Sequence, residues 1–318
     1  MGTLARVQAD PLLVVIVGPT ASGKSALAVT LAQLLAGEIV SCDSVALYRH
    51  FEIGTAKPTR EQLAAVPHHL IDVAEPETPF TAGDYARRAR AVIAEVAQRR
   101  RLPVVVGGTG LYLRALLEGL FPGPQRSEQL RNRLRTRASE RSSAYLHRIL
   151  RRIDAPAAAN IHPNDTPKLI RAIEVCLASR TRMSELWRQR GRDELRGFRI
   201  FRIGLNPSRE ELYARINDRA RKMFERGLIE ETGGLIQDYG NAQRATALNS
   251  LGYKQAAQFL RGELTRQQAV AAAQQGHRNY AKRQMTWFRR EPQVVWLAGF
   301  GDDPSVIQRA TELVASQR

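Results

Sequence analysis

Residues 12–37 read LLVVIVGPTASGKSALAVTLAQLLAG, which is an apolar run, a loop with two glycines and a segment that favours a helix. The apolar run 12–17 predicts a buried strand, and leucines at 27, 31, 34 and 35 predict an apolar helix face. The octet GPTASGKS at 18–25 matches every fixed position of a P-loop. A chance turn between a strand and a helix is the alternative, and the fit of both flanks argues against it.

The order of residues in this octet has a physical reason. Glycines let consecutive backbone N–H groups point into one concavity at a helix N-terminus, where the helix dipole also favours an anion. Lys24 then supplies a positive charge to the outer phosphate, and the Ser25 hydroxyl is placed to bind Mg²⁺. The sequence therefore predicts a site for a diphosphate or triphosphate and leaves open which one.

The composition is that of a basic, globular protein. Its 318 residues are 43% hydrophobic, enough for a large core in a main domain and a smaller one. A formal charge of +17 suggests a polyanionic partner, although a basic protein without a large partner is the plain alternative. The two cysteines fit a reducing compartment, and we find no apolar run typical of a signal peptide or membrane span. We therefore expect a cytoplasmic protein with no membrane partner.

An acidic residue follows the next apolar segment. Residues 38–41 predict a short buried strand that ends at Cys42-Asp43-Ser44. Because the carboxyl ends of parallel strands face the ligand crevice, Asp43 is expected beside the P-loop. An Asp at this position could instead cap a turn that runs through Tyr48.

Residues 51–106 predict a loop, a helix and a third buried strand. The loop at 51–81 contains one short helix near 59–65 and the pair His68-His69, which is a weak sign of a metal site because adjacent side chains of an extended chain diverge. Residues 81–100 predict an amphipathic helix, and 102–106 predict the strand. Listed in order, the expected inner positions of that helix are Tyr85, Ala89, Val92, Ile93 and Val96.

The third strand ends in Gly107-Gly108-Thr109-Gly110 and not in a carboxylate. A hydrolytic P-loop ATPase usually has an acidic residue there to hold Mg²⁺ and its water. A motor or switch ATPase is therefore disfavoured, and a transferase that moves a group from a phosphorylated donor to an acceptor fits better. We expect the glycines to let a second substrate approach, and the Thr109 hydroxyl to bond that substrate or the phosphates.

The composition changes beyond residue 120. The segment 121–124, FPGP, indicates a boundary, and arginines are dense on helical patterns from 126 to 199. We expect an α/β fold with a parallel sheet flanked by helices: a P-loop core at 1–122, an all-helical insertion at 123–197, and the remainder of the core at 198–318. The arginines form either a solvated helix face or a surface that contacts phosphates.

The last part predicts strands at 198–205 and 294–297 and helices between them. Ser208 is a good N-cap with Glu211 placed for a capping box, and Arg215 and Arg219 lie on one face of the helix that follows. Another helix is expected at 228–239. Residues 277–290 interleave cations and aromatic rings, a pattern typical of RNA binding, and a core-facing amphipathic helix is the alternative.

Together these segments resemble the tRNA dimethylallyltransferases, also called tRNA isopentenyltransferases, from about residue 12 to residue 296. The P-loop alone is unspecific, whereas the ordered set of motifs is specific. The motifs are GPTASGKS at 18–25, Asp43-Ser44 with Tyr48, GTAKP at 54–58, GGTGLY at 107–112, HPND at 162–165, RAIE at 171–174, GYK at 252–254, AKRQ at 281–284 and TWFR at 286–289.

The resemblance implies transfer of a dimethylallyl group from dimethylallyl diphosphate to N6 of adenosine 37, beside the anticodon of tRNA, with release of diphosphate. It implies that Asp43 accepts the N6 proton and that Thr109 and Arg219 steady the diphosphate and the reacting geometry. The diphosphate, with Mg²⁺ at Ser25, would be held by Gly18, Pro19, Thr20, Ala21, Ser22, Gly23, Lys24 and Ser25.

The resemblance also implies that the helical insertion embraces the anticodon stem of the tRNA, and we expect the protein to be a monomer. The implied tRNA contacts are Asp43, Ser44, Val45, Ala46, Thr109, Arg131, Pro167, Lys168, Leu169, Ile170, Arg171, Asn249, Ser250, Leu251, Gly252, Tyr253, Lys254, Lys282, Arg283, Gln284, Met285, Thr286, Trp287, Phe288 and Arg289. This chain departs from the family at Ala46, where many members have Gln, and at Lys168, where Arg is common and would add a bidentate fork.

Three other functions are compatible with parts of the sequence. An adenylate prenyltransferase of the cytokinin-forming kind shares the P-loop and the Asp, but it does not need a large basic arm. A small-molecule kinase would use the same P-loop on ATP. An RNA-binding module without catalysis would not need the P-loop together with Asp43.

Overall fold

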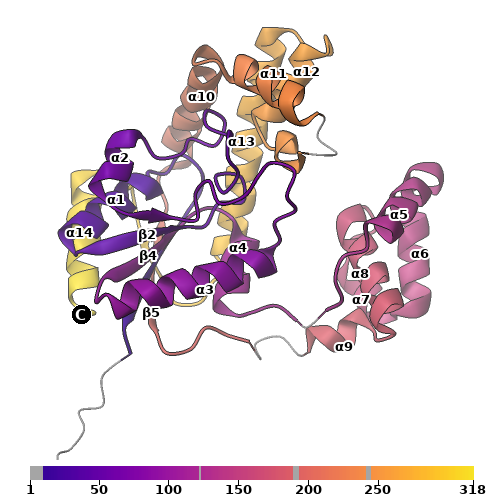
Figure 1. Cartoon of the computed structure of the whole chain (residues 1–318), viewed down its shortest axis with the longest axis horizontal. Coiled ribbons are helices and arrows are strands. Elements are labelled where there is room, and N and C mark those ends of the chain that lie inside the picture. Colours follow the sequence, from indigo (N-terminus) through magenta and orange to yellow (C-terminus); the bar gives the residue numbers. More distant parts are fainter. Residues whose placement is uncertain (1–9, 122, 189–192, 241–244) are drawn as a thin grey trace, which may run out of the picture. The chain divides into compact units, whose positions relative to one another are not determined.

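The computed structural model describes residues 10–121, 123–188, 193–240 and 245–318. Two compact units are present: one combines the chain up to Leu116 with Leu195–Arg318, and the other is Leu117–Glu194 (Figure 1). The second unit begins and ends a few residues earlier than the insertion expected at 123–197. Pro122 of the expected boundary and residues 1–9, where a signal peptide was not expected, lie outside the described residues.

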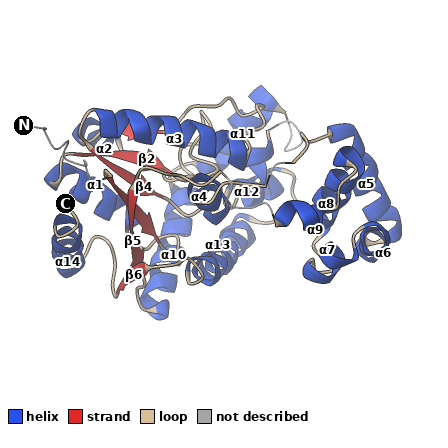
Figure 2. Cartoon of the chain, turned by 90° about the horizontal axis from the view of Figure 1, so that it is seen from below, coloured by secondary structure: helices blue, strands red, loops and turns tan. Residues whose placement is uncertain are grey.

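The first unit is built on a six-stranded parallel sheet with the order β3-β2-β4-β1-β5-β6 (Figure 2). The predicted α/β fold with a parallel sheet is confirmed. The sequence did not predict β3, because its two histidines carry no apolar pattern. The strands are β1 (Leu12–Val17), β2 (Gly37–Ser41), β3 (His68–His69), β4 (Leu102–Val106), β5 (Arg199–Leu205) and β6 (Val294–Leu297).

Helices cover both faces of this sheet, as the complete burial of β1 requires. One face packs against α1 (Lys24–Leu34) and α14 (Pro304–Ala315), while α3 (Ala82–Gln98) packs against β2 and β4 and contributes nothing to that cluster. The other helices are α2 (Arg60–Ala65), α4 (Gly110–Leu117), α10 (Arg209–Glu225), α11 (Leu228–Tyr239), the 3₁₀ helix η1 (Thr246–Asn249), α12 (Tyr253–Leu260) and α13 (Arg266–Phe288).

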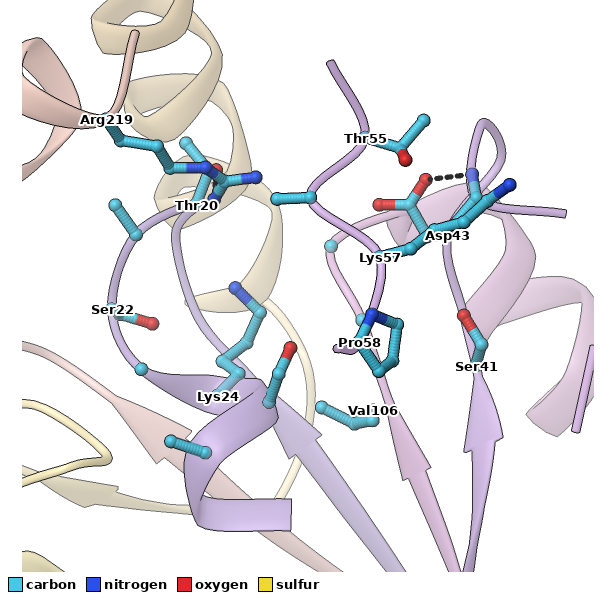
Figure 3. A pocket seen from close by; sticks show the side chains of 18 of the residues that line it. Thr20, Ser22, Lys24, Ser41, Asp43, Thr55, Lys57, Pro58, Val106 and Arg219 are labelled. Carbon is cyan, nitrogen blue, oxygen red and sulfur yellow. Dashed lines mark hydrogen bonds between the residues drawn. The ribbon is translucent and has the colours of Figure 1, made fainter. Parts of the chain in front are cut away.

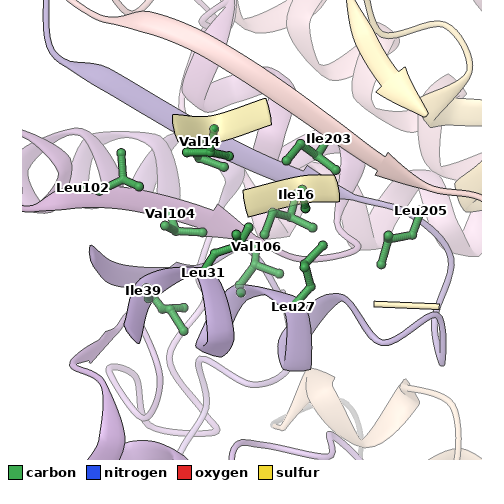
Figure 4. Close-up of a cluster of buried hydrophobic side chains, with 14 of the residues drawn as sticks. Val14, Ile16, Leu27, Leu31, Ile39, Leu102, Val104, Val106, Ile203 and Leu205 are labelled. Carbon is green, nitrogen blue, oxygen red and sulfur yellow. The ribbon is translucent and has the colours of Figure 1, made fainter. Parts of the chain in front are cut away.

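A core of buried hydrophobic side chains lies between α1 and the sheet (Figure 4). Alternate residues of β1, Val14 and Ile16, meet Leu27 and Leu31 of α1, and all four are fully buried. The expected position of Leu34 in this face is wrong, since its side chain is 60% exposed. The buried face of α1 consists of Leu27, Ala28, Leu31 and Ala32, and Leu34 lies outside this face.

The carboxyl ends of the central strands are aligned. Ile16 of β1 pairs with Val106 of β4, and Val106 pairs with Ser41 of β2. The P-loop, the Cys42-Asp43 turn and Gly107-Gly108 therefore leave the sheet side by side. The sheet register alone brings the three predicted site segments together.

The elements described in the second unit are all helices with a core of their own. They are α5 (Glu128–Arg141), α6 (Ser143–Ile153), α7 (Ala155–Asn160), α8 (Thr166–Ser179) and α9 (Met183–Trp187). Buried Asp154 accepts hydrogen bonds from the amide of Ala157 and from the amide and hydroxyl of Ser184. This carboxylate ties α9 back to the start of α7. In the residues described for both units, we find no helix long and apolar enough to cross a membrane.

Two leucines of α1 offer a matched test of this packing. We expect Leu31→Ala to lower the free energy of unfolding by about 2–5 kcal/mol, because it opens a cavity in the core. Leu34→Ala removes an exposed side chain of the same type and should change it by less than about 0.5 kcal/mol. Denaturant unfolding of both variants measures the difference, and equal losses would contradict the assigned orientation of α1.

Candidate active site

A pocket of about 670 Å³ opens where the carboxyl ends of β1, β2 and β4 meet (Figure 3). Its walls include the P-loop residues 20–25, Asp43, Gly107-Gly108 and Arg219. The sequence placed the P-loop and Asp43 side by side, and the structure brings them into one pocket. Gly18 and Pro19 do not line it, and Gly18 lies instead against the backbone of Leu205.

Contacts within the P-loop and contacts with the loop 299–303 fix its conformation. Gly23 has φ +81°, and a Cβ there would lie 2.7 Å from Asp302 Oδ1 and from the amide nitrogen of Gly301. The Gly301 amide donates to the Ser22 carbonyl at 2.9 Å. Lys24 Nζ donates to the Pro19 carbonyl at 2.6 Å and so closes the loop on itself. Only glycine at position 23 lets the loop 299–303 support the P-loop this closely.

The buried cations Lys24 and Arg219 interact with each other and with the carboxylate of Asp43 beside the P-loop. Arg219 Nη1 donates to Thr20 Oγ1 at 3.2 Å, so the guanidinium reaches the P-loop from α10. Burial and the Arg219 charge lower the pKa of Lys24 to about 7, while Asp43 acts in the opposite direction. Burial also lowers the pKa of Arg219, and Asp43 again opposes the shift. Each cation would therefore be more stable beside an additional anion.

Arg219 belongs to a row of cations on α10 and at its C-cap. Arg215, Arg219, Lys222 and Arg226 all line the pocket and recur every three or four residues. Arg215 pairs with Asp302 at 2.7 Å, and Lys222 pairs with Asp218 at 2.8 Å. The sequence predicted Arg215 and Arg219 on one face of this helix, and the same helical spacing also points to Lys222 and Arg226, which were not predicted.

Asp43 performs the capping role and also lines the pocket. Its Oδ1 accepts hydrogen bonds from the amides of Val45 at 2.8 Å and Ala46 at 3.1 Å, which is the turn-capping alternative. Oδ2 has no hydrogen-bond donor in the described part of the chain. One carboxylate oxygen therefore fixes the orientation of the side chain, and the other is available to a substrate.

The structure does not bring Thr109 into the pocket. Its hydroxyl accepts from the amide of Ser44 at 3.1 Å and donates to Ser44 Oγ at 3.3 Å. Thr109 therefore stabilises the turn that carries Asp43. The predicted direct contact with the diphosphate or the acceptor does not follow from this arrangement, because the hydroxyl is already paired.

The glycines beside Thr109 are required by the protein's own packing. A Cβ on Gly107 would lie 2.1 Å from the Cys42 carbonyl oxygen. A Cβ on Gly108 would lie 2.0 Å from Gln284 Nε2, and one on Gly110 would meet the Trp287 ring. Gly107 and Gly108 also line the pocket, so the close approach of a second substrate to these glycines stays a prediction.

Gln284 joins three walls of the pocket. Its Oε1 accepts from the amide of Thr20 at 2.7 Å, and its Nε2 donates to the Gly108 carbonyl at 2.9 Å. Tyr280 donates to the same carbonyl at 3.2 Å. The side chain of Gln284 is buried, so this face of α13 matches the core-facing alternative. Arg278 is half-buried and donates to Asn217 Oδ1, whereas the other Lys and Arg side chains of the segment are exposed: Lys282, Arg283, Arg289 and Arg290.

The loop that carries the GTAKP motif is also fixed by internal bonds. Lys57, with 5% of its side chain exposed, donates to the Tyr48 carbonyl at 2.8 Å and pairs with Asp72 and Glu52. The Gly54 amide donates to the Tyr253 hydroxyl at 3.1 Å, and this hydroxyl donates to Glu231. These bonds explain the motif structurally and hold the 53–58 wall of the pocket.

Several of the side chains expected to touch tRNA are core residues. Leu169 and Ile170 belong to the core of the second unit, and Tyr253 and Phe288 are buried in the first. Side-chain contacts from these four residues are therefore excluded in this conformation. Ala46 is also buried, but it lines the active-site pocket. The exposed members of the expected set are Pro167, Lys168, Asn249, Lys254, Lys282, Arg283, Thr286 and Arg289.

Arg131 and Arg171 have a structural role in the second unit. Glu174 is completely buried, and its Oε2 lies 2.8 Å from Arg171 Nη1 and 3.6 Å from Arg131 Nη1. Glu174 Oε1 also accepts from the Ser127 amide at 2.7 Å. A buried carboxylate needs such partners, so replacing either arginine would disturb the helical unit as well as any RNA contact.

The described residues contain no group of three His, Cys, Asp or Glu side chains that could hold a metal ion. His69 is bonded to Glu38 at 2.8 Å, and His68 to the Val66 carbonyl at 2.7 Å. Ser25, the predicted Mg²⁺ ligand, is exposed where α1 begins and lines the pocket. Its hydroxyl has no partner among the residues that the structure describes.

Comparison with known proteins gives one consistent family. A family model described as IPP transferase matches residues 46–291. The tRNA dimethylallyltransferase of Koribacter versatilis is 64% identical over 305 residues, which are 96% of this chain and 98% of that protein. The protein of the same name from Solibacter usitatus is 52% identical and covers 95% of this chain and 98% of its own.

Solved structures show the same architecture. The full-length tRNA isopentenylpyrophosphate transferase from Bacillus halodurans superposes with a TM-score of 0.71 at 37% identity and covers 96% of each chain. A eukaryotic dimethylallyltransferase acting on tRNA gives a TM-score of 0.79 at 24% identity, over 97% of this chain and 80% of that one. At this lower identity, the second match shows the fold alone.

The bridge formed by Gln284 can be tested with a variant of similar size. We expect Gln284→Met to lower the free energy of unfolding by about 1–3 kcal/mol, because the Thr20 amide and the Gly108 carbonyl lose their partner. Gln275→Met, an exposed glutamine on the same helix, should change it by less than about 0.5 kcal/mol. Denaturant unfolding gives both values. An unchanged stability in Gln284→Met would show that the bridge contributes nothing.

Proposed function

This chain belongs to the IPP transferase family, and from that membership we propose that it transfers a dimethylallyl group from dimethylallyl diphosphate to N6 of adenosine 37 in tRNA, releasing diphosphate. The observation that supports the proposal most is one pocket holding a P-loop with two cations, Lys24 and Arg219, and an available carboxylate oxygen of Asp43. The cations match a diphosphate, and the carboxylate matches a proton acceptor. As a tRNA-modifying enzyme, it would act in the cytoplasm.

The P-loop, Lys24 and Arg219 bind the diphosphate in this proposal. Backbone amides at the start of α1 and the two cations stabilise the negative charge that grows as the C–O bond to the allyl group breaks. Binding also relieves the repulsion between Lys24 and Arg219, so Lys24 takes up a proton where it was neutral. The attraction between these groups and the diphosphate becomes stronger as the diphosphate gains negative charge in the transition state. Only interactions that are stronger in the transition state than with the bound substrate accelerate a reaction.

Ser25 fits a Mg²⁺ ion shared with the diphosphate. Mg²⁺ is commonly held by one or two protein oxygens together with substrate phosphates and water, and the free Ser25 hydroxyl supplies one such oxygen. When bound, the ion would neutralise charge on the departing diphosphate. The chain's own contribution is to hold the Ser25 hydroxyl at the end of the P-loop, facing the pocket.

Asp43 accepts the proton of the adenine amine. An adenine amine is a poor nucleophile because its lone pair is delocalised, so the proton leaves only as the new C–N bond forms. The amides of Val45 and Ala46 keep Oδ1 occupied, and Oδ2 is left to receive the proton. Thr109 acts indirectly in this proposal. Its hydroxyl accepts a hydrogen bond from the Ser44 amide and so holds the residue next to Asp43 in place.

Apolar side chains line the pocket close to these polar groups. Pro58 and Val106 lie between Lys24 and Asp43 in the view of Figure 3, and Ile39 and Ile71 line the same pocket. A dimethylallyl group has only apolar atoms, so this wall fits it and excludes water from the developing carbocation. The target adenosine must leave its base stack to reach the pocket.

The exposed cations of α13 and the arginine-rich helices of the second unit support a large polyanionic acceptor. An adenylate acceptor would not need them, and a kinase would need a phosphoryl acceptor beside the P-loop. We therefore favour tRNA over AMP, and prenyl transfer over phosphoryl transfer. We also propose that the protein acts as a monomer.

One assay separates these possibilities. The purified protein is incubated with Mg²⁺ and labelled dimethylallyl diphosphate, with unmodified tRNA in one reaction and AMP in another, and the labelled nucleoside is identified after digestion. We expect label on tRNA adenosine only. Label on AMP alone would favour the cytokinin-forming activity, and label on neither would contradict prenyl transfer.

In the same assay, Asp43→Asn should lower turnover by about 10²–10⁴-fold, because the amide keeps the Oδ1 acceptor but cannot take a proton. Affinity for tRNA should change by no more than about threefold, since loop geometry is retained. Asp218→Asn removes another pocket-lining carboxylate, one already paired with Arg221 and Lys222, and should leave turnover nearly unchanged. A collapse of tRNA affinity in Asp43→Asn would show that Asp43 binds RNA and does not act as the base.

A further inference from the structure

A second hollow, of about 320 Å³, lies between the start of α10 and the end of α13. It contains Pro19 of the P-loop, whereas the active-site pocket begins at Thr20, and the two cavities share no lining residue among those described. On α13, Gln284 faces the active site and the next residue, Met285, lines the second hollow. The two cavities are therefore neighbours on either side of one stretch of backbone.

The second hollow is strongly cationic. Arg209, Lys282 and Arg289 line it, and its described lining includes no carboxylate. None of the three forms an ion pair within the part of the chain that the structure describes. Other arginines of α10 differ in this respect, since Arg215 and Arg221 are both paired with carboxylates. The unpaired charges favour an anion as the ligand.

The remaining walls offer flat and apolar surface. The Tyr213 ring is held at the edge of a small core cluster, and the Arg209 guanidinium lies over it at 5.1 Å from the ring centroid. Leu212 and Met285 add apolar surface beside the ring. An aromatic ring with a cation and nearby apolar side chains is the combination on which unpaired bases stack, while free cations hold the phosphate.

We propose that this hollow binds one unpaired nucleotide of the RNA substrate. This nucleotide is close, along the RNA strand, to the nucleotide that enters the active site. Its base stacks on Tyr213, and its phosphate lies among Arg209, Lys282 and Arg289. This inference rests on the proposed function and extends it, because it adds Arg209 and Tyr213 to the RNA-binding residues and assigns them a single nucleotide. Holding a neighbouring nucleotide would help to keep the target adenosine out of its stack.

Tyr213→Leu tests the stacking, because leucine keeps apolar volume but offers no ring. We expect the Kd for an anticodon stem-loop RNA to rise about 5- to 100-fold. Arg209→Ala should weaken binding and lower the salt dependence by about one phosphate contact. Arg221→Ala, on the same helix and outside the hollow, is the charge control and should change the Kd by less than about twofold. Unfolding temperatures and the affinity for inorganic diphosphate show whether each variant is still folded.

An abasic scan of the loop then identifies the nucleotide. In the wild-type protein, one abasic position other than the target should raise the Kd by about the same factor as Tyr213→Leu. In Tyr213→Leu that abasic substitution should have almost no further effect, because both changes remove the same contact. Additive effects at every position, or an unchanged Kd in Tyr213→Leu, would overturn the proposal.

Two further outcomes also decide the inference. If free AMP protects Tyr213 from modification while no abasic position matters, the hollow is a mononucleotide site and the RNA assignment is wrong. The labelled-donor assay on the wild-type protein judges the proposed function separately. Transfer to tRNA together with a failed scan would overturn this inference alone, whereas absent transfer would overturn the proposed function whatever the scan shows.

Discussion

The burial of Lys24 beside a second cation, Arg219, offset only in part by Asp43, is the constraint on which the active site depends. Burial and Arg219 bring the pKa of Lys24 to about 7, so at neutral pH this lysine is easily converted between its charged and neutral forms. Like charges held together in a partly buried pocket reduce the stability of the protein alone. The same arrangement gives a multivalent anion its binding energy, which is the trade between stability and function that active sites often show.

The rest of the first unit keeps these charges in place. The P-loop is tied to the loop 299–303 through Gly301 and to α13 through Gln284, and α10 delivers Arg219 to Thr20. Each wall is fixed by a segment far away in the sequence. Such long-range hydrogen bonds hold the charged groups near their working positions before a substrate binds, which is how electrostatic catalysis avoids reorganisation during the reaction.

The sequence predicted the features that are local. The apolar runs predicted strands β1, β2, β4, β5 and β6. The fixed positions of the motif predicted the P-loop, and the end of a predicted strand placed Asp43 beside it. The roles of Thr109 and of the glycines at 107–110 could not be read locally, because they depend on Ser44, Cys42 and Gln284. The two faces of α13 show the same limit: Gln284 and Phe288 are buried, Lys282 and Arg283 are exposed, and only the packing separates these side chains. Lys222 and Arg226 were within reach of the helical spacing and were overlooked.

The most direct test of the account measures the binding of Mg²⁺-diphosphate by calorimetry to the wild-type protein, Lys24→Met and Arg219→Met. Charge-assisted hydrogen bonds contribute about 1.5–3 kcal/mol each, so each variant should bind diphosphate about 10- to 100-fold more weakly. Each substitution removes a like-charge neighbour and also a hydrogen bond, to the Pro19 carbonyl or to Thr20 Oγ1. Because these two effects oppose each other, the unfolding temperature of the unliganded protein should change little. Unchanged diphosphate affinity, or weaker binding that accompanies a clear loss of stability, would contradict the claim that these two cations form the diphosphate site.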